Sequence, residues 1–242
     1  MTQEELQQQW YARYYRALGS DRNDPRINAG ARFQALAFEF SLIRALAHID
    51  IDPARSTLLD VGCGSAAGLY QYIRLGFKQS NVTGLDVQAS RIESARAACP
   101  HARFVHGDAS NMEFEDSVFD VVSESTLFVS LISDELRTAI ASEMLRVCRP
   151  GGYLVLTDWR TPRPGNPNYK ALTRREVRRL FRVGDETELV ARSCGALIPP
   201  LGRFVSRHAW PFYFLIAGMA PALVGQVVYL LQKPPAGSGN WR

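Results

Sequence analysis

One short stretch constrains the fold of this chain more than any other: residues 58–68, which read LLDVGCGSAAG. An apolar run followed at once by glycines and small residues is typical of a buried strand that ends in a tight turn. Glycines at such a turn let a ligand approach the backbone closely. The stretch therefore predicts a ligand site at the end of the first strand.

Strand-like and helix-like segments alternate along the chain after this point. Strand-like runs occupy residues 81–87, 102–108, 119–125 and 151–158, and helical patterns occupy residues 65–77, 90–99 and 133–147. Ser90 is expected to cap the second of these helices, because Glu93 completes a capping box with it. Such alternation predicts an α/β fold with a doubly wound parallel sheet, in which ligands bind at the carboxyl ends of the strands. A basic segment at residues 173–182 is expected to form a further helix with Val177, Leu180 and Phe181 turned inward.

The composition bears on partners and on compartment. The chain has 242 residues and a formal charge of +4, and its basic residues are nearly all arginine, so no nucleic-acid partner is predicted. Four cysteines, at positions 63, 99, 148 and 194, lie far apart and form neither a C-x-x-C motif nor a disulfide scaffold. The first residues lack the basic start and apolar run of a signal peptide. We therefore expect a cytoplasmic protein with reduced thiols.

The position of Asp60 decides what kind of ligand the glycine turn favours. The pattern of Gly62, Gly64 and Ala67 satisfies the dinucleotide fingerprint, although such a match is weak alone. A carboxylate two residues before the first glycine would repel a pyrophosphate by about 4 kcal/mol per charge pair at 4 Å and an effective dielectric of 20. A ligand that carries an ammonium and a sulfonium group reverses the sign of this interaction.

Two further acids follow the next two strands. Asp86 lies 22 residues after Gly64 (86 − 64), close to the spacing at which an acid meets a ribose diol. Asp108 follows the third strand, where it or the neighbouring amide could bond an adenine edge. Together these acids favour a purine nucleoside without phosphates. The alternative for each acid is that it caps a helix or orients a loop.

Four segments together resemble the class I S-adenosylmethionine-dependent methyltransferases. They are residues 58–68, 82–96, 102–128 and 143–160, in the order and spacing of that family. The resemblance implies a seven-stranded sheet whose last strand is antiparallel, and S-adenosyl-L-methionine as the cofactor. It also implies a set of cofactor-binding residues: Asp60, Gly62, Cys63 and Gly64 around the methionine end, Asp86 and Val87 at the ribose, Asp108 and Ala109 at the adenine, and Ser123 near the sulfonium.

Methyl transfer from a sulfonium is a displacement from an activated donor, so the protein mainly aligns the reactants and excludes water. A hydroxyl acceptor must also lose its proton, and Glu124 and Asp158, both at strand ends, are the predicted catalytic bases. His106 and His208 are weaker alternatives. The four histidines do not cluster with each other or with acids at ligand spacing, so no metal is predicted. The residues after the fourth strand read SEST rather than an NPPY-type signature, which favours oxygen over nitrogen as the acceptor atom.

The terminal parts are predicted to surround this core. Residues 1–50 are rich in aromatic side chains and are expected to form a helical cap or lid, with residues 51–242 as the methyltransferase domain. If the family fold holds, residues 185–198 and 223–231 supply the last two strands, and residues 199–222 form a helical insertion between them. The prolines and glycine of this insertion argue against a continuous membrane-spanning helix.

Two interpretations of the insertion stay open. It packs on the domain or on a second subunit, or residues 203–220 contact the inner face of a membrane peripherally. The predicted reaction is O-methylation of a small molecule, with a sugar or lipid-linked glycan favoured over a quinone or other secondary metabolite. Rivals are a non-catalytic cofactor-binding protein, a nucleotide-dependent oxidoreductase and an RNA methyltransferase. The sequence indicates no oligomeric state.

Overall fold

The computed structural model describes residues 27–163 and 165–237. These residues form two compact units. The insertion unit contains residues 27–40 and 194–226, and the sheet unit contains residues 41–193 and 227–237. The aromatic residues at positions 10–15, which were predicted to pack the cap, lie outside the described residues. The predicted division at residue 50 stays a prediction.

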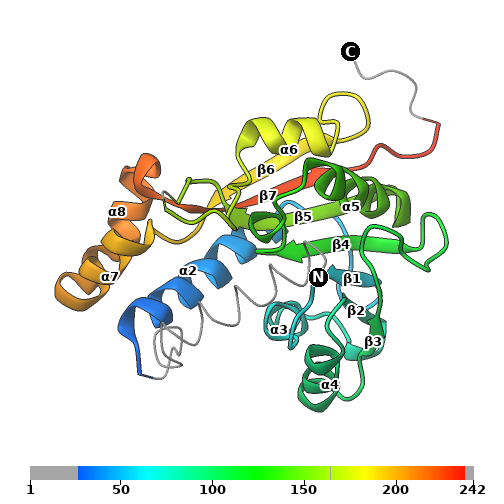
Figure 1. Ribbon diagram of the computed structural model, residues 1–242, viewed down its shortest axis with the longest axis horizontal. Helices are drawn as coiled ribbons and strands as arrows, with labels where there is room; N and C mark the ends of the chain where they lie inside the picture. Colours follow the sequence, from blue (N-terminus) through cyan, green and yellow to red (C-terminus); the bar gives the residue numbers. More distant parts are fainter. Residues whose placement is uncertain (1–26, 164, 238–242) are drawn as a thin grey trace. The chain divides into compact units, whose positions relative to one another are not determined.

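A seven-stranded sheet has the order β3-β2-β1-β4-β5-β7-β6 (Figure 1). The strands are β1 (Leu58–Val61), β2 (Val82–Asp86), β3 (Arg103–His106), β4 (Phe119–Ser125), β5 (Cys148–Trp159), β6 (Glu188–Cys194) and β7 (Gln226–Gln232). The first five pair in parallel, and β7 is antiparallel. This arrangement confirms the predicted fold class. The strand order reverses direction at β1, which makes the carboxyl ends of β1 and β4 the switch point where ligands bind in open α/β sheets.

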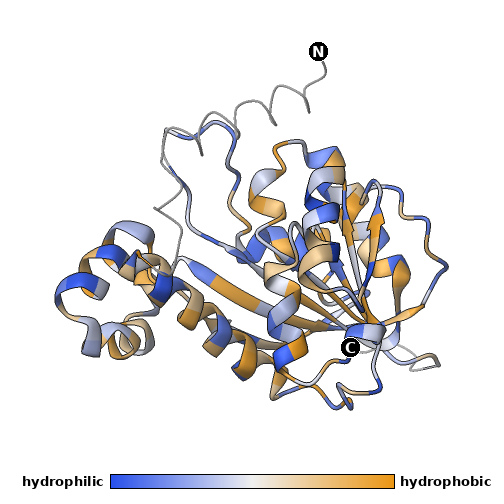
Figure 2. Cartoon of the chain, turned by 90° about the horizontal axis from the view of Figure 1, so that it is seen from below, coloured by the Kyte–Doolittle hydropathy of each residue, from blue (hydrophilic) through white to orange (hydrophobic). Residues whose placement is uncertain are grey.

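The central strands form because their sequences are almost continuously apolar. Leu58, Leu59 and Val61 of β1 are completely buried, and all of β2 is buried as well. Burial on both faces is expected for parallel strands covered by helices, and it removes the need for alternation with polar residues. Figure 2 shows the strands of the sheet coloured mainly as hydrophobic. Among the buried polar residues, Asp60 and Ser123 lie towards the carboxyl ends of their strands.

Four helices of the sheet unit connect or follow the strands. They are α3 (Ala67–Arg74), α4 (Ala89–Ala98), α5 (Asp134–Val147) and α6 (Arg174–Leu180). The α4 helix contacts β2 and β3, and α5 contacts β4, β5 and α6. In α6, Val177 and Leu180 are buried, as is Phe181 just after it, which confirms the predicted inward face.

The start of α4 differs from the prediction. The helix begins at Ala89 with Gln88 as its N-cap, so Ser90 lies inside the helix and is not the cap. The Gln88 N–H instead donates to Asp86 Oδ1 at 2.9 Å. Asp86, at the end of the preceding strand, thus accepts the N–H of the N-cap residue itself, and no side chain caps the helix.

The insertion unit is helical, as predicted for the segment between the last two strands. It contains the first part of α2 (Ala29–Leu46), then α7 (Pro199–His208), η4 (Trp210–Phe212), α8 (Tyr213–Met219) and η5 (Pro221–Leu223). Aromatic rings join α2 to α8: Phe33 lies 5.1 Å from Tyr213, and Phe40 lies 5.7 Å from Phe214, measured between ring centroids. Of the helices in the described part of the chain, none has the length and apolar character needed to cross a membrane.

Candidate active site

The glycine turn after β1 is a left-handed stretch of backbone. Gly62 and Gly64 have φ angles of +71° and +55°, a region that side-chain-bearing residues rarely adopt. The N–H groups of Gly62 and Cys63 both donate to Leu85 O, at 2.8 and 3.0 Å. These bonds hold the turn against the end of β2. This geometry agrees with the prediction that the glycines form a tight turn whose backbone a ligand can approach closely.

Asp86 shapes the same turn from the end of β2. Its Oδ2 accepts the Gly64 N–H at 2.9 Å, while its Oδ1 accepts the Gln88 N–H. The loop-orienting alternative for this acid therefore applies. Each carboxylate oxygen can accept a second hydrogen bond, so these contacts leave room for a hydroxyl of a ligand.

Asp60 is buried beside this turn with no cation against it among its described contacts. The parallel register places it opposite Ser123 of β4, whose Oγ donates to Asp60 Oδ1 at 2.9 Å. Burial raises the pKa of Asp60 to about 7; the hydrogen bond from Ser123 opposes this rise and the negative charge of Asp86 adds to it. Asp60 is therefore a buried acid with no positively charged side chain among the causes of its pKa shift. Gly68 of α3 also lies close, because a Cβ at that position would be 3.8 Å from Asp60 Oδ2.

The remaining predicted cofactor residues lie at the outer ends of β1, β2 and β3. The exposed Asp108 accepts both the backbone N–H and the hydroxyl of Ser110 at 2.8 Å, which closes a local turn. Ala109 beside it is half-buried, and Val87 is largely exposed. Cys63 is buried, and burial raises the pKa of its thiol. Cys63 is therefore a packing residue of the turn rather than a nucleophile.

Glu124 follows Ser123 but serves the opposite face of the sheet, because successive side chains of a strand alternate. It is buried, and its Oε2 accepts the Leu127 N–H at 3.0 Å. Its Oε1 is buried with no hydrogen-bond partner among the described residues. Burial, followed by the charge of Asp158, raises the pKa of Glu124 well above its ordinary range.

Asp158 is also completely buried, and both of its oxygens are occupied. Oδ2 accepts the Val129 N–H at 3.0 Å, and Oδ1 accepts the Trp159 N–H at 2.7 Å. Burial raises the pKa of Asp158 to about 7, against which the backbone N–H groups and the charge of Arg137 act. Glu124 and Asp158 thus both hold the backbone that follows β4. Their predicted role as bases stays a prediction.

Arg137 of α5 is a residue that the sequence analysis missed. Its side chain is completely buried, and its Nη1 donates to Phe128 O at 3.0 Å and to Lys170 O at 3.1 Å. Its Nη2 lies 3.3 Å from Glu176 Oε2. A signal was available, because Arg137 shares the helical spacing of the buried residues Ile140 and Met144. An arginine on the apolar stripe of a helix indicates a buried polar contact.

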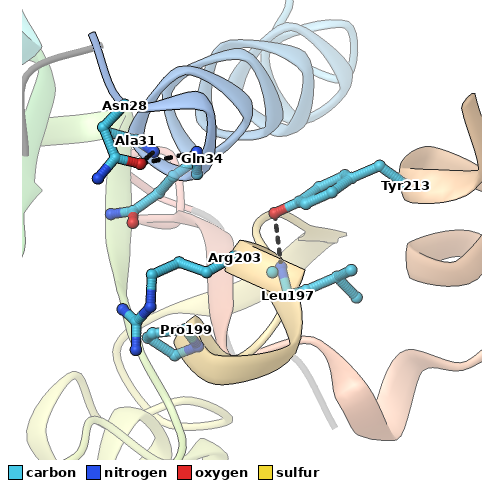
Figure 3. A pocket seen from close by; sticks show the side chains of 9 residues that line it. Asn28, Ala31, Gln34, Leu197, Pro199, Arg203 and Tyr213 are labelled. Carbon is cyan, nitrogen blue, oxygen red and sulfur yellow. Dashed lines mark hydrogen bonds between the residues drawn. The ribbon is translucent and has the colours of Figure 1, made fainter. Parts of the chain in front are cut away.

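A small pocket lies elsewhere, inside the insertion unit (Figure 3). Gln34 of α2, Arg203 of α7 and Tyr213 of α8 line it, together with Asn28 just before α2. The Tyr213 hydroxyl accepts the Leu197 N–H at 3.2 Å. Its volume of about 30 Å³ holds about two water molecules. The residues that line it include none of the predicted site residues. Neither its size nor its location suits a nucleoside ligand.

Residues 58–152 match the family described as "Methyltransferase domain". The chain is 33% identical over 145 residues to phthiotriol/phenolphthiotriol dimycocerosates methyltransferase 1 of Mycobacterium ulcerans, which covers 55% of this chain and 51% of that protein. It is 34% identical over 115 residues to the 2-methyl-6-phytyl-1,4-hydroquinone methyltransferase of Synechocystis, which covers 46% of this chain and 34% of that protein. The chain thus spans about half of the first relative's length and about a third of the second's.

A solved structure shows the same fold. The 1,6-didemethyltoxoflavin-N1-methyltransferase of Burkholderia thailandensis, with S-adenosylhomocysteine bound, superposes with a TM-score of 0.56 at 16% identity, covering 82% of this chain and 78% of that one. The family match over residues 58–152, the strand order and the glycine turn agree that these residues form a class I S-adenosylmethionine-dependent methyltransferase domain. S-adenosyl-L-methionine is the methyl donor of this class.

Proposed function

We propose that the protein transfers a methyl group from S-adenosylmethionine to a hydroxyl oxygen of a lipid-like acceptor. The observation that carries the cofactor part is the pair Asp60 and Asp86 beside a bared glycine turn. Two acids at this turn disfavour a pyrophosphate and favour a ligand that carries positive charge and a ribose.

The residues present fit S-adenosylmethionine. Asp60 is a carboxyl group whose pKa burial raises to about 7, and the ammonium and sulfonium of the donor would supply it with a positive partner. We propose that Asp60, Gly62 and Gly64 hold the methionine end and that Asp86 accepts the ribose hydroxyls. Asp108 and Ala109 are proposed for the adenine edge, where Asp108 is exposed beyond β3.

When bound, the donor supplies a methyl group on a sulfonium that is already activated for displacement. The chain has to orient the acceptor, exclude water and take up the hydroxyl proton. Glu124 and Asp158 remain the proposed proton acceptors. Their burial and their bonds to Leu127 and Val129 support a second role, which is to fix the backbone after β4 at the edge of the site.

The relatives support an acceptor that joins a hydroxyl-bearing head to a long hydrocarbon. One is named for phthiotriol and phenolphthiotriol dimycocerosates and the other for a phytyl hydroquinone. Both names favour the lipid part of the predicted lipid-linked glycan, whereas the sugar head stays a prediction. A quinone precursor is the second candidate, favoured by the phytyl hydroquinone relative. We also propose a cytoplasmic location, which the four unpaired cysteines support.

Two measurements test the proposal in order. Calorimetric titration compares S-adenosylhomocysteine with NADH and ATP, and we expect selective micromolar binding of the first. Transfer of a labelled methyl group into a lipid extract, followed by mild alkaline hydrolysis and chromatography, then identifies the acceptor class. A preference for NADH or ATP would refute the cofactor assignment. Binding without transfer to any lipid or quinone fraction would favour a non-catalytic binding protein.

A further inference from the structure

The outer surface of the insertion unit is unusually apolar. Phe212, Leu215 and Met219 recur at helical spacing on the side of η4 and α8 opposite the buried Tyr213 and Ala217. Met219 is 77% exposed, and the other two are more than half exposed. A helix on the surface of a soluble domain normally turns polar residues outward. Residues 209–225 contain no charged residue at all.

The preceding helix continues this surface with aromatic and basic side chains. In α7, Gly202, Val205 and Ser206 are buried, so the opposite side of the helix faces outward. That side carries Phe204, which is 62% exposed, together with the exposed Arg207 and His208. The exposed Trp210 of η4 follows them, and these four residues make up the aromatic and basic part of the surface. The Phe204 and His208 rings lie 5.1 Å apart. Aromatic rings beside guanidinium groups are suited to the headgroup layer of a bilayer.

Charge decides between the occupants that such a surface could have. After Glu188 the sequence contains no Asp or Glu, so residues 189–242 carry basic charges only, among them Arg203 and Arg207. A surface with apolar rings, arginines and no acids is complementary to anionic lipid headgroups over an acyl layer.

We propose that Phe204, Trp210, Phe212, Leu215 and Met219 form a docking face that inserts into the surface of an anionic lipid bilayer. The helices would lie in the interface with Arg207 among the headgroups. This proposal goes beyond methyl transfer. It rests on the proposed function in one respect only, which is that a lipid acceptor resides in the bilayer and would give the docking its purpose.

Vesicle sedimentation tests the docking face without any cofactor or acceptor. Sucrose-loaded vesicles of equal parts phosphatidylglycerol and phosphatidylcholine are compared with vesicles of phosphatidylcholine alone. The test variant is the triple change Phe212→Ser, Leu215→Ser and Met219→Ser, and its control is Val118→Ser, an exposed apolar residue of the sheet unit. We expect the wild type to sediment with the anionic vesicles, the triple variant to bind roughly tenfold less or weaker still, and the control to bind as the wild type.

A charge pair of variants tests the electrostatic part. Arg207→Glu should weaken binding several-fold at low salt and less at high salt, whereas Arg175→Glu, an exposed arginine of α6, should leave it unchanged. No sedimentation of the wild type, equal binding to neutral vesicles, or equal loss in the two control variants would overturn the proposal. Light scattering that shows a dimer dissociating in the triple variant would assign the face to a second copy of the chain instead. S-adenosylhomocysteine titration of every variant keeps the two proposals separate, because a docking failure leaves that affinity intact.

Discussion

The raised pKa of Asp60 predicts that cofactor affinity depends on pH around neutrality. In the free protein its carboxyl group has a pKa of about 7, because it is buried and lies near the negative Asp86. A bound ligand with a positive group would stabilise the ionised form and return the pKa towards its ordinary value, so binding releases a proton. The charge of Asp60 also acts on Tyr72 and Glu124, and burial raises the pKa of both above their ordinary values.

The size of the effect follows from the cost of ionising Asp60 before binding. With a pKa of about 7, the affinity is reduced about elevenfold at pH 6, about twofold at pH 7 and hardly at all at pH 8. Between pH 8 and pH 6 the binding free energy should therefore weaken by about 1.4 kcal/mol. Cofactor affinity is therefore highest above pH 7 and decreases as the pH falls.

Calorimetric titration with S-adenosylhomocysteine at pH 6, 7 and 8 measures this dependence. Repeating it in buffers of different ionisation enthalpy at pH 7 should reveal release of about half a proton. Asp60→Asn keeps an oxygen for the Ser123 hydroxyl and removes the titration, so its affinity should be lower at pH 8 and nearly flat with pH. A wild-type affinity that does not change from pH 6 to pH 8, or an equal slope in the variant, would refute the reasoning.

Four further predictions concern the same part of the sheet unit. Asp86→Asn should weaken S-adenosylhomocysteine binding by about tenfold, measured by titration, because the amide loses both a ribose acceptor and one of the two backbone contacts. Glu124→Gln should change the free energy of unfolding by less than about 1 kcal/mol, since the amide keeps an oxygen that can accept the Leu127 N–H; turnover about a hundredfold lower with unchanged cofactor affinity would identify a base. Arg137→Met should lower the free energy of unfolding by about 3 kcal/mol in urea, because three carbonyls lose their donor and Glu176 loses one of its two arginine partners. The free energy of unfolding of the ligand-free protein should decrease as pH rises from 5 to 8, because Asp60 and Asp158, with folded pKa values of about 7, hold protons that the unfolded chain has released; a flat profile would contradict both shifts.

Some of this structure could be predicted from the residues alone. Strands β1 and β2 were evident because a buried parallel strand is continuously apolar, and the inward side of α6 was evident from its spacing. The antiparallel β7 could be predicted only through the family resemblance, because an apolar run does not encode strand direction. The cap of α4 was predicted wrongly at Ser90, since Asp86, which looked like a ligand residue only, also takes the backbone donor of Gln88.

The turn after β4 could not be predicted, because its structure depends on contacts between residues far apart in the sequence. The Glu124 carboxyl group accepts the N–H of Leu127 in this turn, and the Asp158 carboxyl group accepts the N–H of Val129. Arg137 donates to the Phe128 carbonyl of the same turn. The Leu127 side chain in turn closes on the glycine turn, because a Cβ on Gly62 would lie 3.0 Å from Leu127 Cδ1. A buried set of charges is therefore connected, through one leucine, to the backbone proposed to hold the cofactor. Substitutions at Arg137 or Asp158 that loosen this turn should reduce cofactor affinity even though neither residue is proposed to touch the cofactor.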